Sequence, residues 1–170
     1  MAEPRYIITG ASSGIGAALA LRLAKDGSSL GLIARRPERL EDVAQACREH
    51  GVTVATRLAD VPNHDGLKAA ILELDDALEG ADVLISNAGV AIPTPAIGGE
   101  IEDIKTVIDV NLTGALAAIH AILPRFLERK AGQVVGVASV AGYRGLPGSG
   151  SYSASKAGFI AALESMRVEL

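Results

Sequence analysis

The sequence predicts an α/β fold, a doubly wound parallel sheet between two layers of helices. Short apolar or β-branched runs alternate with longer segments of helical period along the chain. Glycine, asparagine or proline marks each change from one kind of segment to the other. The apolar runs lack the alternation of a half-exposed sheet, so both faces of the sheet are expected to be covered. Strands joined by helices in this way run parallel, through right-handed crossovers.

Five strands and five helices are expected. Gly27 and Gly51 stand where the first two helices need C-terminal caps, and Pro37 stands where a first helical turn accepts proline. In chain order, the expected elements are the strand 5–9, the helix 15–25, the strand 29–34, the helix 37–50, the strand 52–58, the helix 64–78, the strand 82–86, the helix 102–129, the strand 133–139 and the helix 151–170.

Length and composition limit the classes of protein. The 170 residues fit one domain around a single core, and 49% of them are hydrophobic. A formal net charge of −4, spread along the chain, argues against a nucleic-acid partner. The lone Cys47 excludes an internal disulfide, and the three histidines are too far apart to predict a metal site. No export signal begins the chain, so a cytoplasmic location is expected.

Membrane insertion is not expected either. The longest nearly apolar run, residues 115–123, is interrupted by His120. It is far shorter than the roughly 18 residues that indicate a membrane span.

A glycine-rich turn follows the first expected strand. Residues 9–16 read Thr-Gly-Ala-Ser-Ser-Gly-Ile-Gly. Small residues let the backbone approach a ligand, and the free N–H groups of the following helix favour a phosphate. No Gly-Lys-Ser/Thr follows, which excludes a nucleoside-triphosphatase loop. A tight connection without a ligand is the alternative. The turn predicts a Rossmann-like pyrophosphate site formed by Gly10, Ser12, Ser13, Gly14, Ile15 and Gly16.

Two arginines stand where a dinucleotide site selects its ribose, about twenty residues beyond the turn. The second expected strand runs into Leu-Ile-Ala-Arg-Arg, which offers no acidic residue to the 2′-hydroxyl of NAD. Arg35 and Arg36 instead offer planar, permanently charged donors suited to a 2′-phosphate. The expected cofactor is therefore NADP(H), with NAD(H) as the second candidate. Arginines that only solvate a loop are the alternative interpretation.

Tyr152 precedes Lys156 by four residues, just beyond a glycine-rich loop. Residues four apart share a helix face, so both side chains are expected to project toward the carboxyl edge of the sheet, where doubly wound folds bind ligands. A nearby ammonium stabilises the phenolate of a tyrosine. Such a pair can protonate the alkoxide formed when a carbonyl is reduced, or take a proton from an alcohol. A packed tyrosine beside a solvated lysine is the alternative.

Together these motifs resemble those of the short-chain dehydrogenase/reductase family, in its single-domain oxidoreductase branch. The resemblance spans nearly the whole chain, and the order and placement of the short motifs make it specific. Besides the turn at residues 9–16, the matching residues are Asp60 and Val61 after the third strand, Asn87, Ala88 and Gly89 after the fourth, Asn111, Ser139 after the fifth, and the pair Tyr152 and Lys156.

The resemblance implies a role for each matching residue. Tyr152 would be the acid/base, and Lys156 would stabilise its phenolate and hold the nicotinamide ribose. Ser139 would hydrogen-bond the substrate oxygen, and Asn111 would hold a water that relays protons to Lys156. On the cofactor side, Asp60 and Val61 would contact the adenine, and Asn87, Ala88 and Gly89 would line the groove. Taken alone, Asp60 could equally cap a turn and Asn111 bond back to its helix.

Two features depart from the family pattern. Ser86 stands where the family commonly has a second asparagine before Asn87, and it keeps a small hydrogen-bonding side chain. The sequence ends at Leu170, where family members continue through two more strands and a substrate-covering segment. The single dinucleotide-binding domain, residues 1–170, is therefore expected to be truncated at its C-terminus and to lack the last strands of its sheet.

The expected function is the interconversion of a carbonyl and a secondary alcohol by hydride transfer, on a small-molecule ketone or alcohol. A non-catalytic dinucleotide-binding or assembly module is the alternative, and an epimerase or dehydratase on the same cofactor is a third hypothesis. Part of the helix 102–129 is apolar nearly all round, which favours burial on more than one side. The resemblance implies pairing through this helix and the helix 151–170, as a homodimer or homotetramer.

Overall fold

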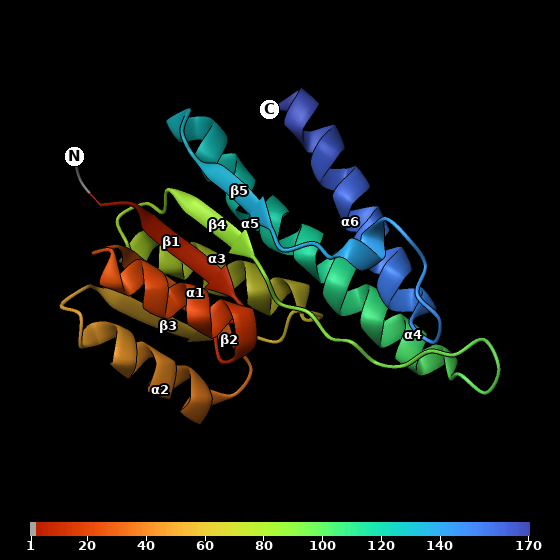
Figure 1. The fold of residues 1–170 in the computed structure, drawn as a ribbon. Coiled ribbons are helices and arrows are strands. Elements are labelled where there is room, and N and C mark those ends of the chain that lie inside the picture. Colours follow the sequence, from red (N-terminus) through yellow and green to blue (C-terminus); the bar gives the residue numbers. More distant parts are fainter. Residues whose placement is uncertain (1–2) are drawn as a thin grey trace.

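Five parallel strands form one sheet in the order β3-β2-β1-β4-β5 (Figure 1). The structure is a computed structural model and describes residues 3–170. The chain moves outward from β1 to β3 and then, from β4, in the opposite direction, so β1 and β4 meet at the switch point of the sheet. The doubly wound, Rossmann-like prediction is confirmed. The strands are β1 (Arg5–Thr9), β2 (Ser29–Ala34), β3 (Val54–Leu58), β4 (Val83–Ser86) and β5 (Gln133–Gly136).

Helices cover both faces of the sheet (Figure 1). One face packs against α1 (Gly14–Lys25) and α2 (Pro37–Arg48), and the other against α3 (His64–Ala77), α5 (Gly114–Arg129) and α6 (Gly150–Glu169). The pleat sends neighbouring residues of one strand to opposite faces. Ile7 of β1 therefore joins the core under α3 and α5, and Ile8 joins the core under α1 and α2.

The expected helix boundaries are confirmed at the glycines and the proline. Gly27 and Gly51 take positive φ angles of 89° and 78° after α1 and α2, a conformation that glycine adopts without strain. Pro37 is the first residue of α2, where its missing N–H costs no hydrogen bond. After each glycine the chain returns to the sheet, as β2 after Gly27 and as β3 after Gly51.

The helical segment expected over residues 102–129 is confirmed over residues 101–129, but it contains a π-helical turn that the sequence did not predict. It consists of α4 (Ile101–Ile108), a π-helical turn (Asp109–Thr113) and α5. The side chain of Asn111, at the centre of the turn, hydrogen-bonds the backbone of Val90 in the loop after β4. Gly114 follows, and a Cβ there would lie 2.2 Å from Cγ1 of Val61. The turn thus brings the helix close to two segments that follow strands of the sheet.

The continuous helical segment Ile101–Arg129 has the length and hydropathy of a membrane span, with a mean hydropathy of 1.6. Half of the apolar 18-residue stretch within this segment is buried inside the domain. Residues such as Ala118, Ile119 and Ile122 lie in the core beneath the sheet. The apolar character of this segment is therefore that of a core helix.

Strand β5 ends earlier than expected. The ladder with β4 stops at the pair Ser86 and Gly136, whereas the prediction extended the strand to Ser139. Beyond it, Val137 still donates its N–H to Ser86 O, but its carbonyl turns to the side chain of Lys156. The chain then enters a 3₁₀ turn, Val140–Gly142. This early departure from the sheet brings the segment over α6.

Candidate active site

A cleft of about 500 Å³ opens where the loops after β1, β2, β3 and β4 meet the start of α6. The carboxyl ends of these parallel strands all face it, as expected at a switch point. All of the residues predicted to bind the cofactor line it except Gly16, and the predicted catalytic residues Asn111 and Ser139 do not line it. The predicted residues that line the cleft are Gly10, Ser12, Ser13, Gly14, Ile15, Arg35, Arg36, Asp60, Val61, Asn87, Ala88, Gly89, Tyr152 and Lys156.

The glycine-rich turn packs directly against the loop after β4. Gly10 has φ +69°, and a Cβ there would lie 2.8 Å from Cα of Ala88. Thr9 fixes the same approach, because its Oγ1 accepts from the N–H groups of Asn87 and Ala88 at 3.0 and 3.1 Å. In return, Nδ2 of Asn87 donates to Thr9 O. The two sides of the switch point are thus joined by hydrogen bonds at the floor of the cleft.

The start of α1 offers donors to the cleft. The N-cap residue Ser13 makes no side-chain capping bond, and the first N–H groups of a helix have no partner within it. Around Gly14, which has φ +57°, no other group lies within 4 Å of the position of a Cβ, so a ligand can approach the backbone closely. Open space, unused donors and the positive end of the helix dipole together fit an anionic pyrophosphate.

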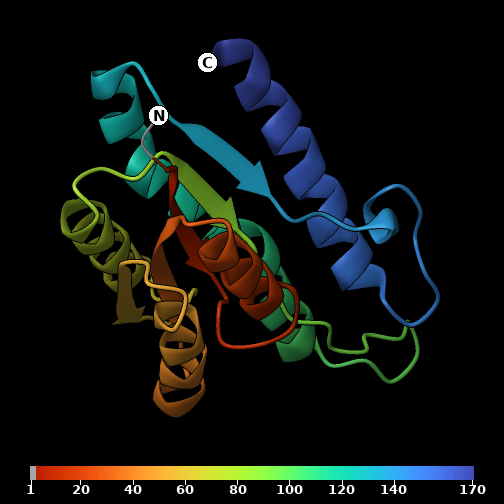
Figure 2. The same cartoon turned by 60° about the vertical axis from the view of Figure 1, so that its left-hand side comes forward.

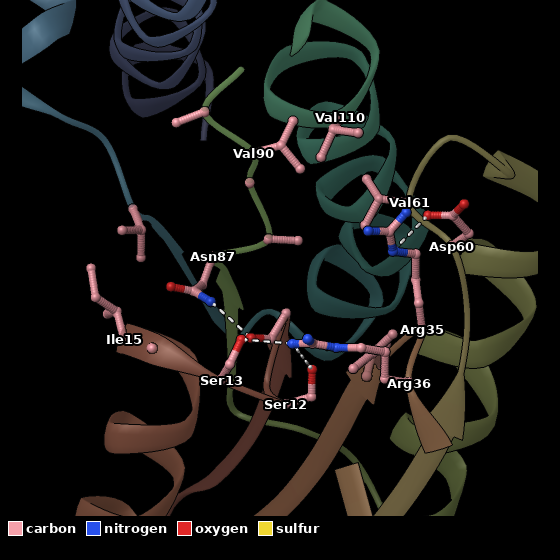
Figure 3. Close-up of a pocket in the computed structure, with 18 of the residues that line it drawn as sticks. Ser12, Ser13, Ile15, Arg35, Arg36, Asp60, Val61, Asn87, Val90 and Val110 are labelled. Carbon is pink, nitrogen blue, oxygen red and sulfur yellow. Dashed lines mark hydrogen bonds and ion pairs between the residues drawn. The ribbon is translucent and has the colours of Figure 1, made fainter. Parts of the chain in front are cut away.

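Both arginines predicted to select the ribose stand at the rim of the cleft (Figure 3). Arg35 lies 3.5 Å from a carboxylate oxygen of Asp60, in a pair whose side chains are 64% and 52% exposed. Arg36 reaches across to the glycine-rich turn and donates to the hydroxyls of Ser12 and Ser13 at 3.5 and 3.0 Å. Exposed pairs of this kind contribute little stability, so the guanidinium groups can turn to another anion at small cost.

The Lys156 ammonium lies inside the cleft wall. Lys156 is only 5% exposed, and its Nζ donates to Val137 O at 2.8 Å. Burial lowers the pKa of Lys156 from its usual value. Nζ also lies 5.9 Å from the ring centre of Tyr152. The phenol and the ammonium are therefore brought together as the four-residue spacing predicts.

Asn111 lies behind the cleft and is fully buried. Its side-chain amide pairs with the backbone of Val90, since Oδ1 accepts from the N–H and Nδ2 donates to the carbonyl, both at 2.8 Å. A Cβ on Gly89 would lie 3.2 Å from Oδ1 of Asn111 and 3.8 Å from Nζ of Lys156. Asn111 thus holds the loop that separates it from the lysine. Its predicted role in holding a water stays a prediction.

Ser139 begins the 3₁₀ turn after β5. Its Oγ accepts from the N–H of Ala141 at 3.2 Å, as an N-cap residue does. This bond leaves the hydroxyl hydrogen of Ser139 free to donate. Its predicted contact with the substrate oxygen stays a prediction. Ser86, the departure from the family pattern, points away to the helix layer and donates to Ala115 O.

Sequence reasoning missed the apolar part of the lining. Small and branched residues complete the walls, and they are Ile33, Ala34, Ala59, Val90, Ala91, Val110, Val137 and Ala138. A signal for most of them was available, because residues at the carboxyl ends of expected parallel strands face the ligand site. Val110 had no such signal, since it reaches the cleft through the π turn.

Comparison with known proteins decides the family. A sequence model described as short chain dehydrogenase matches residues 5–170, nearly the whole chain. The chain belongs to the short-chain dehydrogenase family. The chain is 43% identical to an uncharacterised oxidoreductase of Myxococcus xanthus over 173 residues, which covers 100% of this chain and 68% of that relative.

Relatives with a named activity are similar to this chain as well. Sulfoacetaldehyde reductase 2 of Chromohalobacter salexigens is 42% identical over 153 residues, covering 89% of this chain and 60% of the reductase. The crystal structure of an NAD⁺-bound xylitol dehydrogenase superposes with a TM-score of 0.94 at 29% identity, covering 98% of this chain and 65% of that one. The chain thus spans 68% and 60% of the length of these two curated relatives.

Gly16 gives a direct test of whether the cleft binds a dinucleotide. A Cβ at this position would lie 2.5 Å from Gly10 O and 2.6 Å from Nδ2 of Asn87, so Gly16→Ala must push the turn apart. We expect the variant to lose at least about tenfold in NADPH affinity, because a shift of the turn misaligns the N–H groups that are predicted to bind the pyrophosphate. Fluorescence titration with NADPH measures this, and the chain contains no tryptophan to interfere.

The matched control is Gly145→Ala, at a glycine with an ordinary φ and no group within 4 Å of the added Cβ. Gly16 lies in α1, where alanine forms helix more readily than glycine by about 1 kcal/mol. A loss of affinity in Gly16→Ala would therefore not come from a weaker helix. An affinity of Gly16→Ala equal to that of Gly145→Ala would show that the turn does not hold the cofactor.

Proposed function

We propose that this chain interconverts a carbonyl and a secondary alcohol by hydride transfer, with NADP(H) preferred over NAD(H) and Tyr152 as the acid/base. The observation that carries the proposal is the pair of Tyr152 and Lys156. Both line one cleft, and the buried ammonium lies 5.9 Å from the centre of the phenol ring. A cation at this place favours the phenolate, which allows Tyr152 to give and take a proton.

The residues of the cleft fit a dinucleotide. The N–H groups at the start of α1 suit the pyrophosphate, and Asp60 and Val61 stand where the adenine is expected. Asn87, Ala88 and Gly89 line the path from there to Lys156, which would bind the nicotinamide ribose. When bound, the nicotinamide supplies or accepts the hydride.

The remaining groups handle the substrate oxygen and its proton. Tyr152 protonates the oxygen as its charge grows, and Ser139 donates a second hydrogen bond to it. Lys156 stabilises the phenolate left on Tyr152. Asn111 is proposed to hold a water on the path that returns the proton from solvent. The two hydrogen bonds between the Asn111 side chain and the backbone of Val90 support this role, because they fix the loop beside Nζ of Lys156.

Arg35 and Arg36 support the preference for NADP(H). The family leaves the cofactor open, since the similar xylitol dehydrogenase holds NAD⁺. Arg35→Ala is expected to abolish the preference by weakening NADPH binding about ten- to a hundredfold, the effect of one lost charge-assisted hydrogen bond, while NADH binding changes little. Fluorescence titrations of NADPH and NADH into both proteins give the two dissociation constants.

Arg39→Ala is the control for that titration. Arg39 is exposed on α2 and carries the same charge, but it does not line the cleft. It should keep the preference of the parent chain. Equal affinity of the parent for NADPH and NADH would contradict the proposed role of the arginines in selecting NADP(H). It would leave the assignment of the chain to its family unchanged.

The substrate class is tested with a panel of carbonyl compounds and alcohols. Because one relative is named for reducing sulfoacetaldehyde and a similar structure is a xylitol dehydrogenase, we propose a panel with sulfoacetaldehyde, other short aldehydes and ketones, and xylitol. Oxidation of NADPH or reduction of NADP⁺ is followed by absorbance. Cofactor binding without turnover of any member of the panel would favour a non-catalytic dinucleotide-binding module instead.

We also propose a homodimer or homotetramer that pairs through the helical segment 101–129 and α6. The supporting observation is a face of α6 on which Ala154, Ala157 and Ala161, all exposed, lie one turn apart. Small side chains at this spacing allow a second helix to approach closely.

A further inference from the structure

The loop after β4 is fastened to the first turn of α6 by Thr94. This residue is 6% exposed, although it lies in a connecting loop. Its N–H donates to Gly148 O at 2.8 Å, and it forms an isolated parallel bridge with Ser149. Figure 2 shows the two loops, coloured green and blue, meeting beyond the end of the sheet. We call the contacts of Thr94 with residues 148–151 the Thr94 clasp.

The side chain of Thr94 supplies the cap that α6 lacks. Ser149, the N-cap residue of α6, makes no side-chain capping bond. Instead the N–H of Ser151 donates to Oγ1 of Thr94 at 3.3 Å, and the two hydroxyls share a hydrogen bond of 2.8 Å. An uncapped first turn leaves buried donors without partners, which is unfavourable. A residue far away in the sequence therefore completes the start of this helix.

The Thr94 clasp acts on the helix turn that carries Tyr152. Ser151 is the preceding residue, and it is 8% exposed. Within residues 3–170 no group hydrogen-bonds the hydroxyl of Tyr152, so the place of that hydroxyl depends on the backbone of α6. One turn further along, Lys156 is held separately through Val137 O. Without the clasp, the first turn could shift while the lysine stays in place.

We propose that Thr94 is a positioning residue for the reaction, because it caps α6 from the loop after β4 and so fixes Tyr152 relative to Lys156. This inference rests on the proposed function, since it assigns Tyr152 a proton to transfer. Thr94 does not line the cleft. Its loss should therefore affect turnover and leave cofactor binding intact.

Thr94→Val tests the proposal, because valine keeps the shape of threonine and removes the hydroxyl. For a compound of the panel that the parent chain reduces with NADPH, kcat should fall roughly ten- to a hundredfold, the effect of a misplacement of about 1 Å. The dissociation constant of NADPH and the KM for the carbonyl compound should change little. Thr94→Ser keeps the hydroxyl and should restore kcat.

Two further variants separate positioning from a general loss of structure. Thr106→Val removes another threonine hydroxyl, one that is exposed on α4 and bonds only within its own helix, and it should leave kcat unchanged. Ser151→Ala removes the partner of Thr94. The double variant with Thr94→Val should be no slower than Thr94→Val alone, because both changes break one interaction.

The outcomes distinguish this inference from the proposed function. Turnover that is lost in Tyr152→Phe but unchanged in Thr94→Val overturns the positioning role and leaves the proposed function standing. A fall in kcat that Thr94→Ser does not restore, or that comes with an equal loss of NADPH binding, also overturns it. A parent chain without any turnover that depends on Tyr152 overturns both.

Discussion

Replacing Tyr152 by phenylalanine is expected to lower kcat by about 10²- to 10⁴-fold, the usual contribution of a general acid or base. The change removes one oxygen and keeps the ring that lines the cleft beside Lys156. NADPH should therefore bind nearly as tightly as to the parent chain. The measurement combines a fluorescence titration of NADPH with the rate of NADPH oxidation in the presence of a compound that the parent chain reduces.

Tyr6→Phe is the matched control. Tyr6 lies near the start of β1, packed against the core under α1 and α2, at the edge of the sheet opposite the cleft. It should keep the kcat of the parent. A Tyr152→Phe variant with full activity would contradict the assignment of Tyr152. A loss of activity accompanied by an equal loss of NADPH affinity would mean that Tyr152 serves binding and not proton transfer.

The parts of this molecule that the sequence predicts are those encoded by local patterns. The strand of Arg5–Thr9 and the helix after it follow from hydrophobic periodicity. The ends of α1 and α2 follow from Gly27 and Gly51, because glycine adopts a positive φ without strain. The cleft could be placed for the same reason, because a parallel sheet brings all its carboxyl ends to one edge. Spacing alone predicted the shared face of Tyr152 and Lys156.

The parts that the sequence does not predict depend on contacts between distant segments. Asn111, at the centre of the π turn, finds its hydrogen-bond partners on Val90, and nothing within residues 102–129 indicates that partner. In the same way, the cap of α6 comes from Thr94 and not from the serine next to the helix. A side-chain hydrogen bond over such a separation leaves no periodic pattern, so only the folded structure reveals it.

Asp75, near the end of α3, is expected to be the most important charged residue for stability. It is 1% exposed, and its carboxylate accepts from Arg125 and Arg129 of α5 and from the N–H of Ala81. Asp75→Asn keeps the shape but removes the charge. We expect a loss of about 3 kcal/mol in the free energy of unfolding, the low end for a broken buried pair, because both arginines are about one third exposed and can turn to water.

The neighbouring residue provides the control. Asp76 also pairs with Arg125, but its side chain is 67% exposed. Asp76→Asn should lower the free energy of unfolding by less than about 1 kcal/mol, as is usual for a surface pair. Urea denaturation of the three proteins at neutral pH gives these values. Equal losses in the two variants would show that the burial of Asp75 is not what makes its pairs important.

The effect of Asp75→Asn should also depend on pH, in a direction set by the pKa of Asp75. Burial acts to raise that pKa, but the hydrogen bonds from Arg129, Arg125 and Ala81 outweigh it and hold the pKa below its usual value. The unfolded chain then binds this proton more readily than the folded one, so the stabilisation is complete above the unfolded pKa of about 3.9 and disappears as the pH falls through the folded pKa. Because the asparagine side chain of the variant cannot titrate, the difference between the parent and the variant should be constant from neutral pH to about pH 5 and shrink below about pH 4. A difference that stays constant down to the lowest pH at which the parent remains folded would contradict a carboxylate that is held charged by its two arginines.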